Sequence, residues 1–406
     1  NSIVLALMFS PTNVKIWCKN HSKCICLREV FRPLYLLLSL LGLFPYSIRT
    51  IESNYHFSII KKSIYLNLIC ALFYVSIVCF FLTMHLRHLY FSLETSAMTA
   101  AIMTQLNYIT ELINLTIFCI VSYLSAYIYR FKYVKILNAL ASRIDPPNSN
   151  SEKILTSLGF QIHVVSMGWI TLTCIMQACV NFTRSDSTWK MFLVVFTFNL
   201  PQLIQFTSLA FFYVLIEMII GVLRNITEQA SVLAKEKKIY VYGLTNVDPN
   251  RRLLTLRQME IIYIEMSEVK RMVNQVFEAP ILVTLMQCFH SMVSESYIIY
   301  HGLVAQTDMK LHAVVNCSVW IVYQLMKIYL VARVGNILKI EILKLGKAIH
   351  SIPTERLDLR FMMEVQHFSS AIAFHGSDLT AYGFFSLDAT LTFKVRLQKA
   401  MDENNV

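Results

Sequence analysis

Six long apolar stretches divide this chain of 406 residues and constrain its fold more than any other feature. They cover residues 63–86, 107–129, 158–180, 191–222, 279–303 and 311–332. As an α-helix, each is long enough to cross the hydrocarbon core of a bilayer, which takes about 20 residues. The composition, with 56% hydrophobic and 15% charged residues, is too apolar for an ordinary soluble protein of this length. The sequence therefore predicts an all-α fold, a polytopic membrane helical bundle.

The basic residues indicate how this bundle is oriented. Twenty-eight of the 36 Lys and Arg residues lie in the N-terminal segment, in the second and fourth gaps between stretches, and in residues 333–383 after the sixth stretch; four lie in the other gaps. Because basic loops stay on the cytoplasmic side, the N-terminus is predicted to be cytoplasmic, the reverse of a G-protein-coupled receptor. This distribution matches the net charge of +11 to anionic inner-leaflet lipid, so the lipid bilayer is the expected partner and nucleic acid is not.

Three regions follow from this pattern. Residues 1–62 are predicted to form a cytoplasmic N-terminal segment, with a membrane-skimming helix over residues 31–46. Residues 63–383 are predicted to form the transmembrane bundle of six complete helices. Its long cytoplasmic helical extensions are expected over residues 223–278 and 333–383.

The third region, residues 384–406, is predicted to hold the truncated start of a seventh helix and a polar tail. The apolar run after Gly383 stops at Phe393, about ten residues long where roughly twenty are needed to span. Lys394, Arg396 and Lys399 follow at once, and three cations in six residues are too costly inside a lipid-facing helix. The seventh helix is therefore expected to be incomplete.

The two extensions carry apolar stripes at three- and four-residue steps, which are typical of amphipathic helices. The first stripe is expected to continue into the fifth span, and the second extends the sixth span past the membrane. These stripes suit packing of the two helices on each other or contact between subunits, and the two do not exclude one another. The stripe residues are Leu253, Leu256, Met259, Tyr263, Met266, Val269, Val273 and Val276, then Val334, Ile337, Leu338, Ile342 and Leu345.

An enzyme is not indicated. The chain holds no GxSxG, HExxH, Walker or Rossmann motif. His163, His290, His301 and His312 are scattered over different spans, and a lone helical His is typical of hydrogen-bonded packing. We therefore predict no catalytic residue, no metal site and no cofactor.

Polar and aromatic residues gather in the predicted outer halves of the spans. Intramembrane polar groups normally face the bundle interior, and Glu111 and Glu295 are the costliest to bury. Aromatic rings beside hydrogen-bonding groups suit a small organic ligand, whereas the alternative is that the polar groups only join helices. Pro201 is expected to kink the fourth span nearby. The candidate ligand-binding residues are Tyr108, Glu111, Asn114, Trp169, Gln177, Asn199, Gln202, His290, Ser294, Glu295, Asn316 and Trp320.

Two segments resemble the insect gustatory receptor family. Phe31-Arg32-Pro33-Leu34 through Leu41-Gly42-Leu43-Phe44-Pro45-Tyr46 is similar to the family's N-terminal segment, and Ala381-Tyr382-Gly383-Phe384-Phe385-Ser386-Leu387-Asp388 to its lead-in to the seventh helix. The chain departs from the family after this lead-in. Where members continue through a helix bearing Thr-Tyr and then Gln-Phe, it reads Thr390-Leu391-Thr392-Phe393 and turns basic.

The resemblance implies a ligand-gated, non-selective cation channel in the plasma membrane. Its subunits would form a homo- or hetero-tetramer, bind small-molecule tastants in the outer part of each bundle and place their seventh helices around the pore. The aromatic-rich candidate residues favour a bitter or other non-sugar tastant. An insect odorant receptor subunit is the nearest alternative, and a transporter or a G-protein-coupled receptor would belong to other classes.

Overall fold

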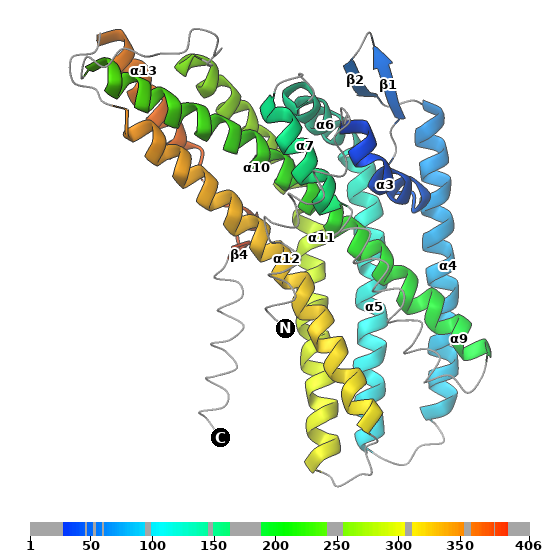
Figure 1. Cartoon of the computed structure of the whole chain (residues 1–406). Coiled ribbons are helices and arrows are strands. Elements are labelled where there is room, and N and C mark those ends of the chain that lie inside the picture. The colour runs from blue at the N-terminus through cyan, green and yellow to red at the C-terminus, as the bar shows by residue number, and fades with distance from the viewer. Residues whose placement is uncertain are drawn as a thin grey trace.

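The fold is a bundle of long helices in a computed structural model (Figure 1). The structure describes residues 27–44, 47–51, 54–58, 61–93, 99–144, 149–162, 188–241, 255–304, 311–352, 359–376 and 378–388. The long helices are α4 (Lys61–Leu93), α5 (Thr99–Ile128), α10 (Leu200–Val241), α11 (Leu256–Val304) and α12 (Leu311–His350). Shorter helices are α3 (Leu27–Leu40), α6 (Arg130–Ile144), α7 (Ser149–Gln161), α9 (Thr188–Val194) and α13 (Leu359–Phe374).

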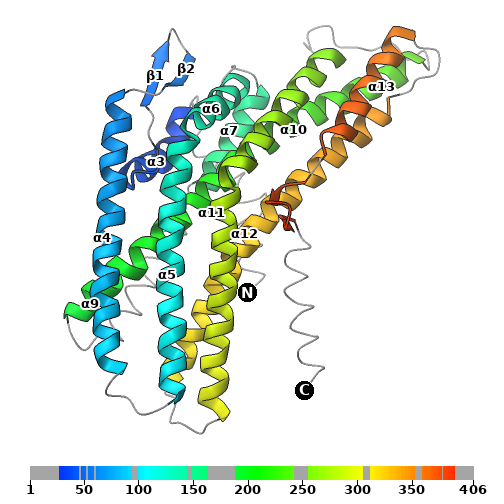
Figure 2. The same ribbon diagram turned by 180° about the vertical axis from the view of Figure 1, so that it is seen from behind.

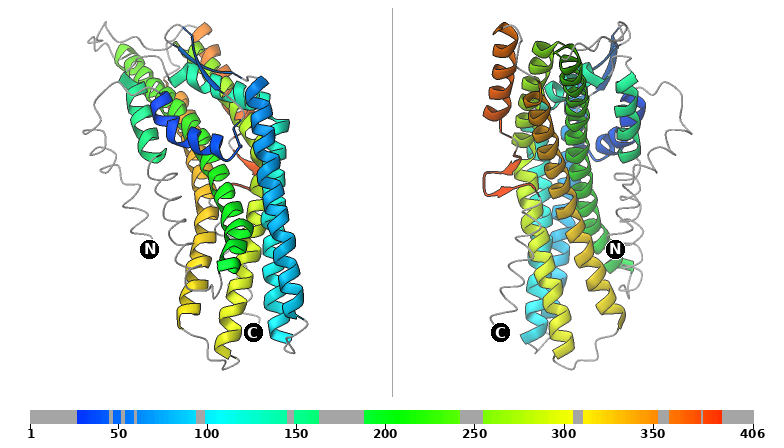
Figure 3. Two further views of the ribbon diagram at one scale, coloured as in Figure 1. Left: turned by 90° about the vertical axis from the view of Figure 1, so that its right-hand side faces the viewer. Right: turned by 60° about the vertical axis from the view of Figure 1, so that its left-hand side comes forward.

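Five helices in the described part of the chain are long and apolar enough to cross a membrane. They coincide with the first, second, fourth, fifth and sixth apolar stretches, which confirms those five predicted spans. The third predicted span, residues 158–180, lies outside the described residues from position 163 onward. α4 runs beside α5, and α5 runs beside the lower part of α11 (Figures 2 and 3).

Three of these helices are far longer than a bilayer requires. α10, α11 and α12 have 42, 49 and 40 residues, which is about 60–75 Å at ~1.5 Å per residue. Their far ends meet beside α13 at one end of the bundle (Figure 2). A single helix, α11, covers the predicted fifth span and the first apolar stripe from Leu256 onward, whereas Leu253 lies outside the described residues.

The stripes are buried inside the chain. Tyr263, Met266 and Val273 on α11 and Leu338 and Leu345 on α12 are buried in one continuous apolar core. α10 and α11 both pack against α12, and α13 packs against α11 and α12. Of the two interpretations of the stripes, the structure shows packing within the subunit.

The N-terminal helix packs on the bundle. α3 buries Phe31, whose ring lies 6.1 Å from the ring of Phe211 on α10, while Leu36 and Leu40 are exposed on the opposite side. The helix ends at Leu40, and Gly42 closes its C-terminal end with a positive φ of 70°. Exposed apolar residues on one side and a buried ring on the other agree with a helix at a lipid boundary.

Two short antiparallel hairpins were not expected from the sequence. β1 (Ser47–Ile51) pairs with β2 (Asn54–Ser58), and β3 (Thr380–Ala381) pairs with β4 (Phe385–Ser386). The second hairpin turns through Tyr382 and Gly383, both with positive φ. It occupies the segment that resembles the lead-in to the seventh helix, and residues after 388 lie outside the described part of the chain.

Prolines inside the long helices have specific compensations. Pro201 has no backbone N–H to donate to the preceding turn of the helix. It follows a π-helical turn over Val195–Asn199, and this wider turn makes room for the proline ring and the missing hydrogen bond. Pro280 lies inside α11, so the Val276 carbonyl cannot accept its usual i+4 bond. Ser125 on α5 donates its hydroxyl to that carbonyl at 2.6 Å. The break in α11 is thereby used to join two spans.

Replacing Ser125 with alanine should therefore destabilise the bundle by about 1–3 kcal/mol, because it leaves a buried carbonyl without a donor. Thermal unfolding of the purified protein in detergent measures this as a lowered Tm. Ser142→Ala is the matched control, since the exposed Ser142 hydroxyl also bonds to a helix carbonyl, that of Ala139 at 2.9 Å. Equal Tm values for the two variants would contradict a special role for Ser125.

A candidate ligand-binding cluster joining four helices

The structure describes ten of the twelve candidate residues, and they lie on five elements. Tyr108, Glu111 and Asn114 lie on α5. Asn199 ends the π-helical turn, and Gln202 lies in the first turn of α10. His290, Ser294 and Glu295 lie on α11, and Asn316 and Trp320 lie on α12. Trp169 and Gln177 lie outside the described residues. Contacts among the ten, and with residues that the sequence did not single out, show which of them meet.

An aromatic group connects three of these elements. Phe198, in the π-helical turn, lies between Trp320 at 5.0 Å and Tyr108 at 6.5 Å between ring centroids. Trp320 also packs on Tyr323, at 5.1 Å, and Tyr108 on His85 of α4, at 5.4 Å. Tyr108 and Trp320 are thus brought together through Phe198. Sequence reasoning missed Phe198 and Tyr323, because an aromatic residue in an apolar span looks the same whether it faces lipid or protein.

Hydrogen bonds hold the polar side of this group. The Trp320 Nε1–H donates to the Ser291 hydroxyl at 3.0 Å, and the Gln324 amide donates to the same oxygen at 3.3 Å. On the neighbouring turn of α11, the Gln287 amide donates to the Glu111 carboxylate at 3.2 Å. Glu111 and Trp320 therefore flank the same face of α11.

Lys327 on α12 is the most unusual residue of the region, and the sequence analysis did not identify it. Its side chain is completely buried, with 0% exposure. The ammonium group donates to the side-chain oxygens of Gln202, Gln205 and Gln324 at 2.5, 2.7 and 3.0 Å. An ammonium has three donors, so these three glutamines satisfy it completely. The signal was present in the sequence, since a basic residue inside an apolar span is by default functional or structurally important.

A directed chain of hydrogen bonds leads from Lys327 to Glu111. Lys327 donates to the Gln205 carbonyl, the Gln205 amide donates to Gln287 at 3.4 Å, and the Gln287 amide donates to Glu111. Each amide accepts on the side of the cation and donates on the side of the carboxylate, so the dipoles align and strengthen one another. We call these four residues the Lys327–Glu111 relay. It joins α12, α10, α11 and α5.

The other candidates lie around the relay. His290 hydrogen-bonds the Asn107 carbonyl of α5 at 3.3 Å. Glu295 lies close enough to Glu111 for the two carboxylates to repel each other. Ser294 is buried on α11, and Asn114, Asn199 and Asn316 are half-buried on their elements. The structure thus brings Tyr108, Glu111, Gln202, Glu295 and Trp320 into one region.

The β3–β4 hairpin lies against the other halves of α11 and α12, away from the candidate residues. Lys270 on α11 donates to the carbonyls of His375 and Gly376 at 3.3 and 2.6 Å, which caps the C-terminal end of α13. Lys339 on α12 lies 3.0 Å from the Asp378 carboxylate and 3.2 Å from the Asp388 carboxylate. These contacts anchor both ends of the hairpin on the helices that carry the ligand candidates.

Gly335 gives the hairpin its place on α12. A Cβ atom at this position would lie 1.6 Å from the carbonyl oxygen of Leu387, so only glycine permits this approach. Gly335 is eight residues beyond Lys327 on the same helix, about 12 Å at ~1.5 Å per residue. A displacement of α12 at the relay would therefore move the hairpin directly.

Comparisons with known proteins agree with this architecture. A family model described as 7tm Chemosensory receptor matches residues 31–395. The insect olfactory receptor OR5 from Machilis hrabei is similar in structure, with a TM-score of 0.68 and 12% identity, over 93% of this chain and 97% of that chain. The same receptor in complex with eugenol gives 0.66 and 12%, over 92% and 96%.

No curated protein matches the chain. The family match nevertheless covers most of its length, and the likeness to the solved receptors independently shows the fold, a helical bundle that crosses the membrane several times. The chain belongs to the seven-transmembrane chemosensory receptor family.

Proposed function

We propose that this chain is a gustatory receptor of the insect type, a subunit of a ligand-gated, non-selective cation channel that detects small-molecule tastants. The observation that carries the proposal is the aromatic group of Tyr108, Phe198 and Trp320 beside a buried polar relay, on helices that continue to the β3–β4 hairpin. That a receptor of the same fold has been solved with eugenol supports a small organic ligand.

The binding surface would combine aromatic faces with a few hydrogen-bonding groups. Trp320 and Phe198 offer stacking surfaces, and Ser291 and Glu111 offer polar atoms beside them. Trp169 and Gln177 remain part of the proposed site. Gln202, Gln205 and Gln324 already accept all three donors of Lys327, which therefore presents no donor to a ligand. Aromatic faces with few donors favour a bitter or other non-sugar tastant over a polyol.

The proposed gating step follows from the helix lengths. A ligand that separates Trp320 from Ser291 changes how α12 lies against α11. α12 would pass that shift to the hairpin through Gly335 and Lys339, and the hairpin leads to the seventh helix in the family. Four subunits with their seventh helices around a pore would then conduct cations.

An odorant receptor subunit is the second candidate, and the likeness to the solved olfactory receptor supports it. Calcium imaging of cells that express the chain, completed with a seventh helix of the family type, separates the two. The proposal expects responses to non-volatile bitter compounds, whereas responses confined to volatile odorants would favour the second candidate. A response confined to simple sugars would contradict the non-sugar preference.

Variants in the cluster should change ligand sensitivity more than surface expression. We expect Glu111→Leu and Glu295→Leu to alter the response. Trp320→Ala is expected to raise the half-maximal ligand concentration about tenfold or more, because it removes a half-buried stacking surface. Val322→Ala is the control, because Val322 on α12 is 51% exposed. If expression and response fell together for both glutamates, these carboxylates would serve folding instead.

A further inference from the structure

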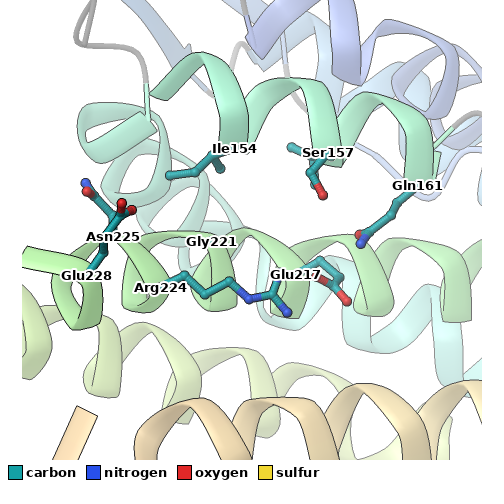
Figure 4. A pocket seen from close by; sticks show the side chains of 9 residues that line it. Ile154, Ser157, Gln161, Glu217, Gly221, Arg224, Asn225 and Glu228 are labelled. Atoms are coloured by element: carbon teal, nitrogen blue, oxygen red, sulfur yellow. The ribbon is translucent and has the colours of Figure 1, made fainter. Parts of the chain in front are cut away.

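A cavity lies between α7 and α10 and has no role in the proposed function (Figure 4). Its volume is about 200 Å³. Figure 4 shows Ser157 and Gln161 reaching from α7 toward Glu217 and Arg224 on α10. The lining residues are Ile154, Ser157, Leu158, Gln161, Glu217, Gly221, Arg224, Asn225 and Glu228.

The cavity lies where the fourth span ends. Arg224 comes two residues after the predicted span of residues 191–222, on the side that the charge rule assigns to the cytoplasm. Close packing of α7 on α10 forms one wall, because a Cβ atom on Gly221 would lie 2.7 Å from the Ile154 Cγ2 atom. A cavity at this depth can receive a soluble molecule or the headgroup of a lipid.

The polar lining is rich in hydrogen-bond acceptors. The Glu217 carboxylate is only 6% exposed and accepts one bond from the Tyr213 hydroxyl, at 3.3 Å. The Gln161 side chain interacts with the same carboxylate, yet its Oε1 atom is buried and accepts no hydrogen bond from any described residue. A buried acceptor without a donor costs about 1–3 kcal/mol, so a donor is missing at this point.

The charge balance determines what kind of donor fits. Glu217 and Glu228 bring two negative charges and Arg224 brings one positive charge, while Arg333 on α12, outside the lining, also attracts the Glu217 carboxylate. The Arg224 Nε–H is shared with Glu341 of α12, at 3.4 Å, so part of its charge is neutralised outside the cavity. The lining is therefore left with an excess of negative charge, and a positively charged donor complements it better than a neutral one.

We propose that this cavity is a binding site for a primary ammonium group, which donates to Gln161 Oε1 and the Glu217 carboxylate. Ile154 and Leu158 contact the carbon atoms next to the amine. The group belongs either to a free small amine or to the headgroup of an ethanolamine phospholipid, since both carry the same R–NH₃⁺ group. Choline, which has no N–H donor, does not meet the requirement of Gln161.

Thermal unfolding of the purified full chain in neutral detergent tests the site, with ethanolamine as the soluble probe and choline as its matched non-donor. A parallel series places the protein in nanodiscs of phosphatidylethanolamine or of phosphatidylcholine at the same anionic lipid content. Tm is expected to rise with ethanolamine or with phosphatidylethanolamine, but not with either choline form. A rise with soluble ethanolamine identifies a free amine, and a rise confined to the nanodiscs identifies the lipid.

Two variants and a control make the result specific. Glu217→Gln keeps the shape of the side chain and an acceptor for Tyr213 but removes the charge. It should raise the ethanolamine concentration needed for a given rise in Tm at least tenfold. Ser157→Leu fills the cavity and should abolish the response even if the first variant folds poorly. Glu268→Gln, on the surface of α11, should respond like the unmodified protein. No Tm shift with any amine, or equal shifts with ethanolamine and choline, would overturn the proposal.

Discussion

Replacing Lys327 with methionine is expected to lower the free energy of unfolding by about 3–5 kcal/mol and to reduce surface expression several-fold. Removing one partner of a buried charged network leaves the others unsatisfied. Here the side-chain oxygens of Gln202, Gln205 and Gln324 would lose their common donor inside the bundle. Surface biotinylation and thermal unfolding in detergent measure the two effects.

A control and a rescue separate this network from a general need for a lysine. Lys347→Met changes an exposed lysine of the same helix and should have little effect. Combining Lys327→Met with leucine at Gln202, Gln205 and Gln324 should recover much of the loss, because replacing a whole buried polar group with apolar residues is often neutral. Unchanged stability of the single variant would show that the relay does not hold the four helices together.

Replacing Gly335 with alanine is expected to reduce the ligand-evoked response at least tenfold while leaving the protein at the cell surface. The new Cβ atom would collide with the Leu387 carbonyl, a backbone group that cannot rotate away, so the β3–β4 hairpin must leave its place on α12. Leu379, Ala381 and Leu387 belong to the apolar core, but most of that core comes from other helices, chiefly α10, α11 and α12, so the bundle is expected to stay folded. Calcium imaging normalised to surface labelling measures the effect.

Gly346→Ala is the matched control for this variant, because a Cβ atom there would meet only the Ile372 side chain, at an ordinary 3.8 Å. Both substitutions place alanine in the same helix, so helix propensity changes equally. If Gly335→Ala and Gly346→Ala responded alike, the hairpin would not transmit the signal from α12.

Much of the fold could be predicted from the sequence, because every helix that crosses a bilayer needs about 20 predominantly apolar residues. The positions of five spans and the apolar stripe of α11 follow from hydropathy and periodicity alone. The β3–β4 hairpin could not be predicted in this way. Its location depends on Gly335, which has no side chain to block the approach of Leu387, and on Lys339. Both residues are distant in sequence from the hairpin.

The candidate site was predictable in part. Glu111 and Trp320 stood out because polar and amphipathic residues are rare inside spans, and the structure places both beside Ser291 and Gln287 of α11. Gln202 was also a candidate from the sequence, whereas Phe198, Gln205 and Gln324 are recognisable only through their partners on other elements. Single-helix patterns carry no information about which helices become neighbours, and that choice determines the relay.

Current recorded in excised outside-out patches tests most directly whether this member of the chemosensory receptor family is itself a ligand-gated channel. Cells would express the chain extended by a seventh helix of the family type, and the pipette solution would contain no GTP or other nucleotide. A tastant that activates intact cells is predicted to evoke a cation current within milliseconds in such patches, and Trp320→Ala is predicted to shift its dose dependence. A current that needs GTP, or that Trp320→Ala leaves unchanged, would contradict the account.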